Sequence, residues 1–237
     1  IDRAMLEFET HRPRSKHIQV PIAQLEGQAA PAPRRRAGLA DGLGACSVDL
    51  RPLAAALSAA SKPLFVIGGG AAKAGADLAA VLEICGAACF ETYAGRGVVP
   101  WDYPLNFGAA LARPSSAQIV AQADCVVAIG TELAEVDLWR AHLGHSCPLY
   151  RIDIDPECLA DMQRAEMAIL ARAEEAMASL RPLMAASASQ WQARSVAHQR
   201  GLWQGETEAE RPGIIAIVEA LRAVVPDDAM IYSDMTQ

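Results

Sequence analysis

Residues 62–74 read KPLFVIGGGAAKA, and this stretch decides the fold of the chain. An apolar run from Leu64 to Ile67 follows Pro63 and precedes three glycines and an alanine-rich segment. A short apolar run with these boundaries predicts a buried strand, a tight turn and the start of a helix. Because glycine has no Cβ, such a turn can adopt positive φ, and a ligand or a neighbouring segment can approach it closely.

Two interpretations of this turn are open. The N–H groups at the start of a helix attract anions, so Gly68, Gly69 and Gly70 are candidate nucleotide-binding residues. The glycines are consecutive, however, and Lys73 replaces the third glycine of a full G-x-G-x-x-G motif. A close-packed turn that binds no ligand would explain the same glycines.

The composition is that of a globular α/β protein. Hydrophobic residues make up 52% of the 237 residues, which supports a sizeable core, and aromatic residues make up only 5%. The formal net charge of −7 argues against a nucleic-acid partner, which normally requires a basic face. No apolar run approaches the roughly 18 residues that span a bilayer, so we expect no membrane partner and a cytoplasmic location.

The cysteines and histidines give no metal motif. The six cysteines lie mostly in apolar segments, without C-x-x-C pairs or regular spacing, so we expect buried thiols rather than disulfides or a zinc site. His142 and His145 are three residues apart, but no third ligand lies at a useful spacing. No metal site is therefore predicted.

Helical and strand-like segments alternate after Asp49. Helices are predicted at 50–57, 76–84, 115–122, from Pro156 and at 173–184, and strands at 64–67, 87–92, 125–129 and 149–155. This alternation predicts an α/β fold, a Rossmann-like parallel sheet with helices on both faces. Ligands of such sheets bind beyond the carboxyl ends of the strands, where we expect the turns at Gly68, Thr92, Gly130 and Asp153.

Shorter segments flank this unit. Residues 1–8 and 214–221 have helical spacing, and residues 17–21 and 229–232 resemble short strands. The chain begins at Ile1 and stops soon after a strand-like run, so we expect a piece of a longer protein. The predicted parts are the end of one domain at 1–25, a linker at 26–47, a central domain at 48–185, a connecting helix or linker at 186–211 and the start of another domain at 212–237.

Several motifs occur in the order found in one enzyme superfamily. They are H-I-x-V-P at 17–21, K-P-x-x-x-x-G-G-G at 62–70, T-x-x-G-R-G-x-x-P at 92–100, A-D-x-V-x-x-I-G-T at 123–131 and I-D-I-D-P at 152–156. The set resembles the thiamine-diphosphate-dependent superfamily, in its group of acetolactate synthases and 2-oxo acid decarboxylases. The resemblance implies that 1–25 end the pyrimidine-binding domain, that 48–185 are the central domain and that 212–237 begin the diphosphate-binding domain.

The resemblance also implies what the full-length enzyme does. It would be a lyase or a transferase that acts on a small 2-oxo acid, with thiamine diphosphate and Mg2+ as cofactors and with a homo-oligomeric assembly, a dimer or tetramer. The activating glutamate and the magnesium motif of the family would lie outside these 237 residues, so we expect no catalytic residue and no activity in this chain alone. The residues that match the loop near the thiamine diphosphate are Ser233, Asp234, Thr236 and Gln237.

A second cofactor site is implied in the central domain, which binds FAD in acetolactate synthases and ADP or nothing in other members. The matching positions are Gly68, Gly69, Gly70, Thr92, Gly95, Gly130, Thr131, Glu132, Asp153 and Asp155. Two characteristic runs of the flavin enzymes are replaced here, at 108–111 and 132–137, with arginines lost and acids gained. We therefore expect an empty or structural pocket rather than FAD or ADP, and Asp155 could simply cap the helix that starts at Pro156.

The run GTELAEVD at 130–137 instead looks like that of decarboxylases acting on 5-guanidino-2-oxopentanoate. An acidic side chain suits a guanidinium group, although Glu132, Glu135 and Asp137 could also be surface or interdomain acids. The alternative from a different class is a free-standing module that binds FAD, ADP or a dinucleotide.

Overall fold

The computed structural model describes residues 8, 14–28, 46–226, 229 and 231. The chain forms two compact units, Ile1–Trp191 and Gln192–Gln237, which are described in turn. Nearly all of the helix predicted at 1–8, half of the strand predicted at 229–232 and the whole loop at 233–237 lie outside the described residues. Within the described part of the chain, no helix is both long enough and apolar enough to cross a bilayer.

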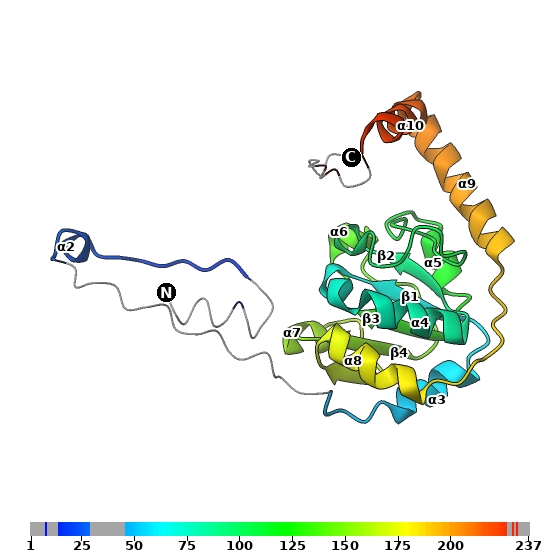
Figure 1. Ribbon diagram of the computed structural model, residues 1–237, viewed down its shortest axis with the longest axis horizontal. Helices are drawn as coiled ribbons and strands as arrows, with labels where there is room; N and C mark the ends of the chain where they lie inside the picture. The colour runs from blue at the N-terminus through cyan, green and yellow to red at the C-terminus, as the bar shows by residue number, and fades with distance from the viewer. Residues whose placement is uncertain (1–7, 9–13, 29–45, 227–228, 230, 232–237) are drawn as a thin grey trace. The chain divides into compact units, whose positions relative to one another are not determined.

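A five-stranded parallel sheet is the centre of the first unit (Figure 1). The strands lie in the order β2-β1-β3-β4-β5, and their bounds are β1 Pro63–Ile67, β2 Ala88–Glu91, β3 Cys125–Ile129, β4 Leu149–Asp153 and β5 Met167–Leu170. Every residue of β1 to β4 is buried, as expected for strands that are covered on both faces. The predicted α/β class with a parallel sheet is therefore confirmed.

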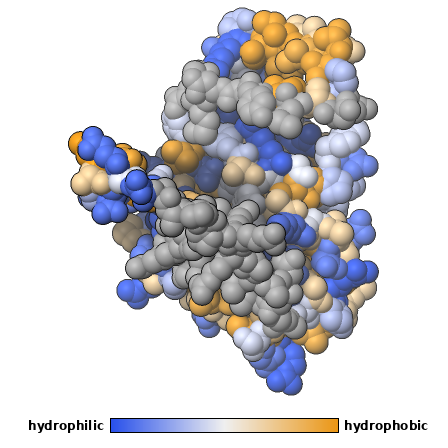
Figure 2. Space-filling view, turned by 60° about the vertical axis from the view of Figure 1, so that its left-hand side comes forward, coloured by the Kyte–Doolittle hydropathy of each residue, from blue (hydrophilic) through white to orange (hydrophobic). Residues whose placement is uncertain are grey.

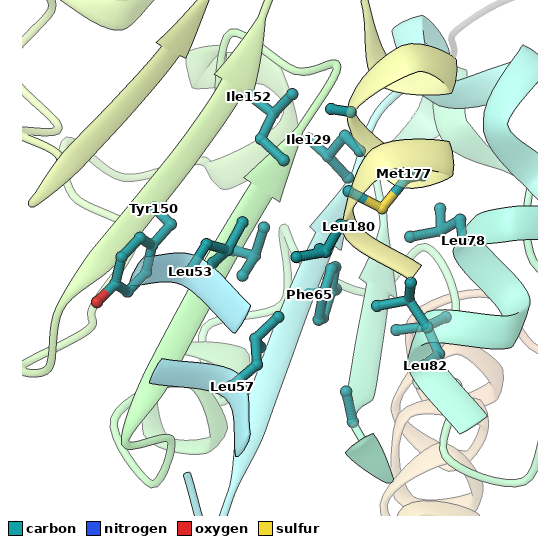
Figure 3. Close-up of a cluster of buried hydrophobic side chains, with 14 of the residues drawn as sticks. Leu53, Leu57, Phe65, Leu78, Leu82, Ile129, Tyr150, Ile152, Met177 and Leu180 are labelled. Atoms are coloured by element: carbon teal, nitrogen blue, oxygen red, sulfur yellow. The ribbon is translucent and has the colours of Figure 1, made fainter. Parts of the chain in front are cut away.

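Three helices cover one face of the sheet with apolar side chains. Figure 3 shows this core, in which α3 Arg51–Ala59, α4 Gly75–Cys85 and α8 Ala173–Leu180 pack against β1, β3 and β4. Phe65 of β1 lies among leucines from these helices and is fully buried. Side chains alternate along a strand, so Leu64 and Val66 face the opposite side, where they are also buried.

Short helices complete the first unit. They are α2 Ile22–Leu25, η1 Gly69–Ala74, η2 Tyr93–Gly95, α5 Ser116–Val120, α6 Glu135–Leu138, α7 Pro156–Leu159 and η3 Arg181–Leu183. Most of them lie in the connections that follow the carboxyl ends of the strands, so they shape the edge of the sheet where a ligand would be expected.

The second unit contains two helices, α9 Ala193–Glu210 and α10 Ile214–Val224. The Glu208 carboxylate accepts hydrogen bonds from the backbone N–H groups of Gly213 and Ile215 and so caps the start of α10. The helix predicted at 214–221 is confirmed, but none of its residues is buried. Figure 2 shows apolar surface over this helix, to which Ile217, Val218, Leu221 and Val224 contribute.

Two predictions about strands were wrong. Residues 17–21 have no regular structure, because a strand needs a neighbour for its N–H and C=O groups and no described segment pairs with this one. Conversely, the sequence analysis missed β5, which pairs with β4 from Tyr150 opposite Met167 onward. Only Ile169 of β5 is buried, so this edge strand has neither the apolar run nor the clear alternation that predicts a strand.

The described core can be tested at Leu180 and Leu183, two leucines that are close together in the chain. Leu180 is fully buried against the sheet, so Leu180→Ala should lower the free energy of unfolding by about 2–5 kcal/mol. Leu183 is 44% exposed, so Leu183→Ala should change it by no more than about 0.5 kcal/mol. Urea unfolding followed by circular dichroism measures both values, and equal losses would contradict the described core.

Candidate functional site

The carboxyl edge of the sheet brings the predicted site residues together. Backbone hydrogen bonds join its loops: Gly68 donates to the carbonyl of Ile129, Thr92 to that of Ile67 and Gly130 to that of Ile152, each at 2.9 Å. The turns that follow β1, β2 and β3 are therefore neighbours, and Asp153 ends the adjacent strand β4. The expected common edge is confirmed, whereas the empty or structural pocket expected there stays a prediction.

The turn after β1 differs from a simple helix start. Gly69 and Gly70 begin the 3-10 helix η1, and the α-helix predicted at 76–84 follows it as α4 Gly75–Cys85. The turn after β2 is similar, since Thr92 precedes η2 and its Oγ1 accepts a hydrogen bond from the N–H of Gly95 at 3.2 Å. Both turns are thus closed by tight local hydrogen bonding.

Asp153 and Asp155 both interact with groups of the chain itself. Asp153 Oδ1 accepts from the N–H of Asp155 at 2.9 Å, and Asp155 Oδ1 accepts from the N–H of Glu157 at 3.0 Å, so Asp155 is the N-cap of α7. The other oxygen of Asp155 accepts from Arg14 Nη2 at 2.6 Å. This contact with the Arg14 guanidinium lowers the pKa of the Asp155 carboxyl. The alternative role of Asp155 as a helix cap is confirmed.

Residues 131–140 form the loop that follows β3. Glu132 and Glu135 are exposed, and Asp137 is half-buried, with Oδ1 accepting from the N–H of Tyr93 at 3.3 Å. Burial, together with the negative charge of the nearby Glu132, raises the pKa of Asp137. The acidic residues singled out in the sequence therefore lie at the same edge as the glycine turns.

Arg140 holds this loop in place, and the sequence analysis missed it. Its guanidinium donates to backbone carbonyls and to one hydroxyl, at 2.9–3.1 Å; the acceptors are Leu111, Leu138, His142, Leu143 and Ser116 Oγ. A single arginine between a tryptophan and an alanine gives no pattern that would predict these contacts. Trp139 beside it is 56% exposed and has a positive φ of 51°.

Arg151 is a second missed residue. It lies within β4 with a side chain that is 1% exposed, and it donates to Asp161 at 2.6 Å and to the carbonyl of Thr131 at 3.3 Å. It thereby joins the strand to the loops that follow β3 and α7. A charged residue inside an otherwise apolar strand could have signalled this role, because a buried charge requires partners.

Two further side chains of this unit, Glu91 and Trp191, have structural contacts. Glu91 accepts from Asn106 and from the N–H of Val99, both at 3.2 Å. Trp191 packs within this unit, since its Nε1 donates to the carbonyl of Pro63 at 2.8 Å and its ring lies edge-on to Phe107. Within the described residues, no group of three or more His, Cys, Asp or Glu side chains could hold a metal ion.

The cysteines are free thiols, in agreement with the sequence analysis. Four are buried and two, Cys46 and Cys147, are partly exposed. Burial raises the pKa of Cys85 to about 11 and that of Cys125 to about 12. These thiols are packing residues of the apolar core.

Comparison with known proteins identifies the fold. Residues 50–180 match the family model described as thiamine pyrophosphate enzyme, central domain. The chain belongs to this family. The match covers more than half of the chain and coincides with the parallel sheet and its helices, so the unit around β1 to β5 is the central domain of a thiamine pyrophosphate enzyme.

Three curated proteins are similar to the chain. The chain is 36% identical over its whole length to "Probable 2-ketoarginine decarboxylase AruI" of Pseudomonas aeruginosa and covers 43% of that protein. It is 28% identical, over 75% of its length, to a pyruvate oxidase of Lactiplantibacillus plantarum, of which it covers 30%. It is 25% identical, over 94% of its length, to the acetolactate synthase isozyme 1 large subunit of Escherichia coli, of which it covers 40%. The chain thus spans less than half the length of each relative.

A solved structure is also similar to the chain. It is described as "X-ray structure of a putative thiamin diphosphate-dependent enzyme isolated from Mycobacterium smegmatis". The TM-score is 0.47 at 23% sequence identity, and the match covers 58% of this chain and 28% of that chain.

The contacts of Arg151 can be tested by substitution. Arg151→Met removes both hydrogen bonds and leaves Asp161 without its cation, so the free energy of unfolding should fall by about 1–3 kcal/mol. Arg181 is the matched control, because its pair with Asp77 at 3.0 Å is at the surface. Arg181→Met should cost no more than about 1 kcal/mol in the same urea titration. A smaller loss for Arg151→Met than for Arg181→Met would contradict the assigned role.

The Asp155 contacts predict that the free energy of unfolding depends on pH. Since the folded pKa of Asp155 is lowered, its stabilising contribution is present above the unfolded value of about 3.9 and is lost as the pH falls through the folded pKa. At pH 7, Asp155→Ala should lower the free energy of unfolding by about 0.5–2 kcal/mol, and Asp155→Asn, which still caps a helix, by less. Unfolding curves at pH 7 and near pH 2 measure this, and for Asp155→Asn the difference from the unmodified chain should shrink at the lower pH.

Proposed function

We propose that this chain is the central domain of a thiamine-diphosphate-dependent decarboxylase that acts on 2-ketoarginine, which is 5-guanidino-2-oxopentanoate. The observation that carries the proposal is the 36% identity to the 2-ketoarginine decarboxylase across the whole chain. The identities to the pyruvate oxidase and the acetolactate synthase are 28% and 25%. The acidic run at 130–137 supports the same substrate class, because a carboxylate suits a guanidinium group.

The domain has a mainly structural role in this proposal. When bound, thiamine diphosphate supplies the carbon nucleophile and accepts the electron pair released with carbon dioxide. The residues of this chain that would approach it, in the loop at 233–237, lie outside the described residues. No described residue is assigned a catalytic step. The sheet instead positions the loops at its carboxyl edge, and Arg140 and Arg151 hold the acidic loop at 131–140 in one shape.

The same proposal includes the assembly of the full-length protein. The family resemblance supports Mg2+ as the partner ion of the diphosphate and a homo-oligomer, a dimer or tetramer. Self-association of this chain is further supported by the apolar side chains that α10 exposes, among them Ile217 at 64% and Val224 at 77%.

The experiment is an assay of the full-length protein that contains this chain. With thiamine diphosphate and Mg2+ added, carbon dioxide release from 5-guanidino-2-oxopentanoate should have a kcat/KM at least tenfold higher than release from pyruvate, about 1.4 kcal/mol in transition-state binding. Omitting thiamine diphosphate should abolish the release. Formation of acetolactate from pyruvate at the higher rate would overturn the proposal in favour of the acetolactate synthase branch.

The acidic loop adds a prediction about substrate recognition. Asp137→Asn should raise the KM for 5-guanidino-2-oxopentanoate about tenfold or more, because a charged hydrogen bond contributes about 1.5–3 kcal/mol, and should leave turnover of pyruvate unchanged. Glu83→Gln, on the exposed face of α4, is the control and should change neither value. An unchanged KM in Asp137→Asn would assign Asp137 to the surface instead.

A further inference from the structure

The glycine turns at the carboxyl edge fit closely against one another. We infer that they form a closed backbone joint and that the central domain binds neither FAD nor ADP there, in keeping with the replaced runs at 108–111 and 132–137. The inference is independent of the substrate proposed above. It depends on the described geometry of the three turns after β1, β2 and β3.

The first argument is steric. A Cβ added to Gly68 would overlap the carbonyl oxygen of Gly130 and lie 2.6 Å from the Cβ of Thr131. A Cβ added to Gly130 would lie 2.5 Å from the backbone nitrogen of Ala71, and one added to Gly95 would overlap the carbonyl oxygen of Ile67. Real Cβ atoms do not approach other atoms this closely. The space that each glycine leaves free is therefore filled by the backbone of another loop.

The second argument concerns the hydrogen-bond donors. A diphosphate at such an edge would be held by backbone N–H groups of the turns. Here six of these groups already donate to protein carbonyls at 2.9–3.1 Å, in the pairs Gly68 to Ile129, Gly70 to Gly130, Ala71 to Gly68, Thr92 to Ile67, Gly95 to Thr92 and Gly130 to Ile152. A diphosphate would have to break several of these hydrogen bonds, and each donor would lose a protein partner that is already in place.

The third argument concerns the groups that would contact a ribose or an adenine. Asp153 accepts from the N–H of Asp155, and Asp155 accepts from the N–H of Glu157 and from Arg14. Both side chains are buried, at 6% and 7% exposure. Next to the joint, the exposed Glu132 and the half-buried Asp137 would repel a diphosphate. The residues at this edge therefore do not fit a dinucleotide.

The joint instead restricts how the loops at this edge can move relative to one another. It connects β1 to both of its neighbours at the level where the strands end, so the loops cannot separate independently. The loop at 131–140 begins directly after Gly130 and is held at its far end by Arg140. The joint thus fixes the position from which the central domain presents its acidic loop.

The test is calorimetric titration of the 237-residue chain with FAD, with ADP and with NAD, together with the absorbance spectrum of the protein as purified. We expect no saturable heat and no flavin absorbance, corresponding to dissociation constants weaker than about 1 mM. Stoichiometric binding of any of the three at micromolar concentration would overturn the inference. The outcome does not depend on which 2-oxo acid the full-length protein uses.

Glycine substitutions provide a second measurement. Gly68→Ala and Gly95→Ala should each lower the thermal unfolding midpoint by more than about 5 °C, or prevent folding, because the joint must open. Gly201→Ala is the matched control, since this glycine lies in α9 with no atom near the position of an added Cβ. It should leave the midpoint unchanged or raise it, because alanine favours a helix. If the first two variants fold with an unchanged midpoint, the joint is refuted even when the titrations show no binding.

Discussion

The close approach of the backbone at Gly68 to the backbone at Gly130 is the constraint on which the carboxyl edge depends. It sets how the turn after β1 meets the turn after β3, and β1 and β3 are the central strands of the sheet. The apolar core below these turns is formed by residues that alternate along the same two strands, such as Phe65 and Val127. The position of each loop at the edge therefore follows from the packing of the strands, with no need for a bound group to hold the loops together.

The polar residues near this edge add a second layer of support. Arg140 and Arg151 donate to backbone carbonyls and to Asp161, and they connect segments that no regular secondary structure joins. Such hydrogen bonds keep the loops in one conformation, since a buried guanidinium that loses its acceptors is costly. The domain thus combines a sheet that is buried on both faces with loops that two arginines hold in place.

Most of the fold could be predicted from the sequence, and the reasons are local. Strands β1 and β3 are buried on both faces and so appear as short apolar runs between turns. Strand β5 could not be predicted, because only one of its residues is buried and its pairing partner is what makes it a strand. The strand predicted at 17–21 was wrong for the opposite reason. These residues alternate like a strand, but no described segment pairs with them.

The sequence analysis predicted where the candidate site lies, but it predicted the roles of only some of its residues. Parallel strands place their carboxyl ends together, so the common edge of Gly68, Thr92, Gly130 and Asp153 followed from the alternation of elements. The contacts of Asp155 with Arg14 and of Arg151 with Asp161 did not follow, because they join segments that no sequence pattern connects. A glycine in a turn can leave room either for a ligand or for the backbone of another segment, and the sequence does not distinguish these two cases.

The buried thiols also have a practical consequence for work with this domain. A thiolate is the form of cysteine that reacts with alkylating reagents, and burial keeps Cys85, Cys89 and Cys125 protonated, with raised pKa values. In the folded chain a maleimide dye at neutral pH would therefore modify chiefly the two partly exposed cysteines, Cys46 and Cys147. In an unfolded chain all six thiols become accessible, so the number of dye molecules attached to each chain reports how much of a sample is folded.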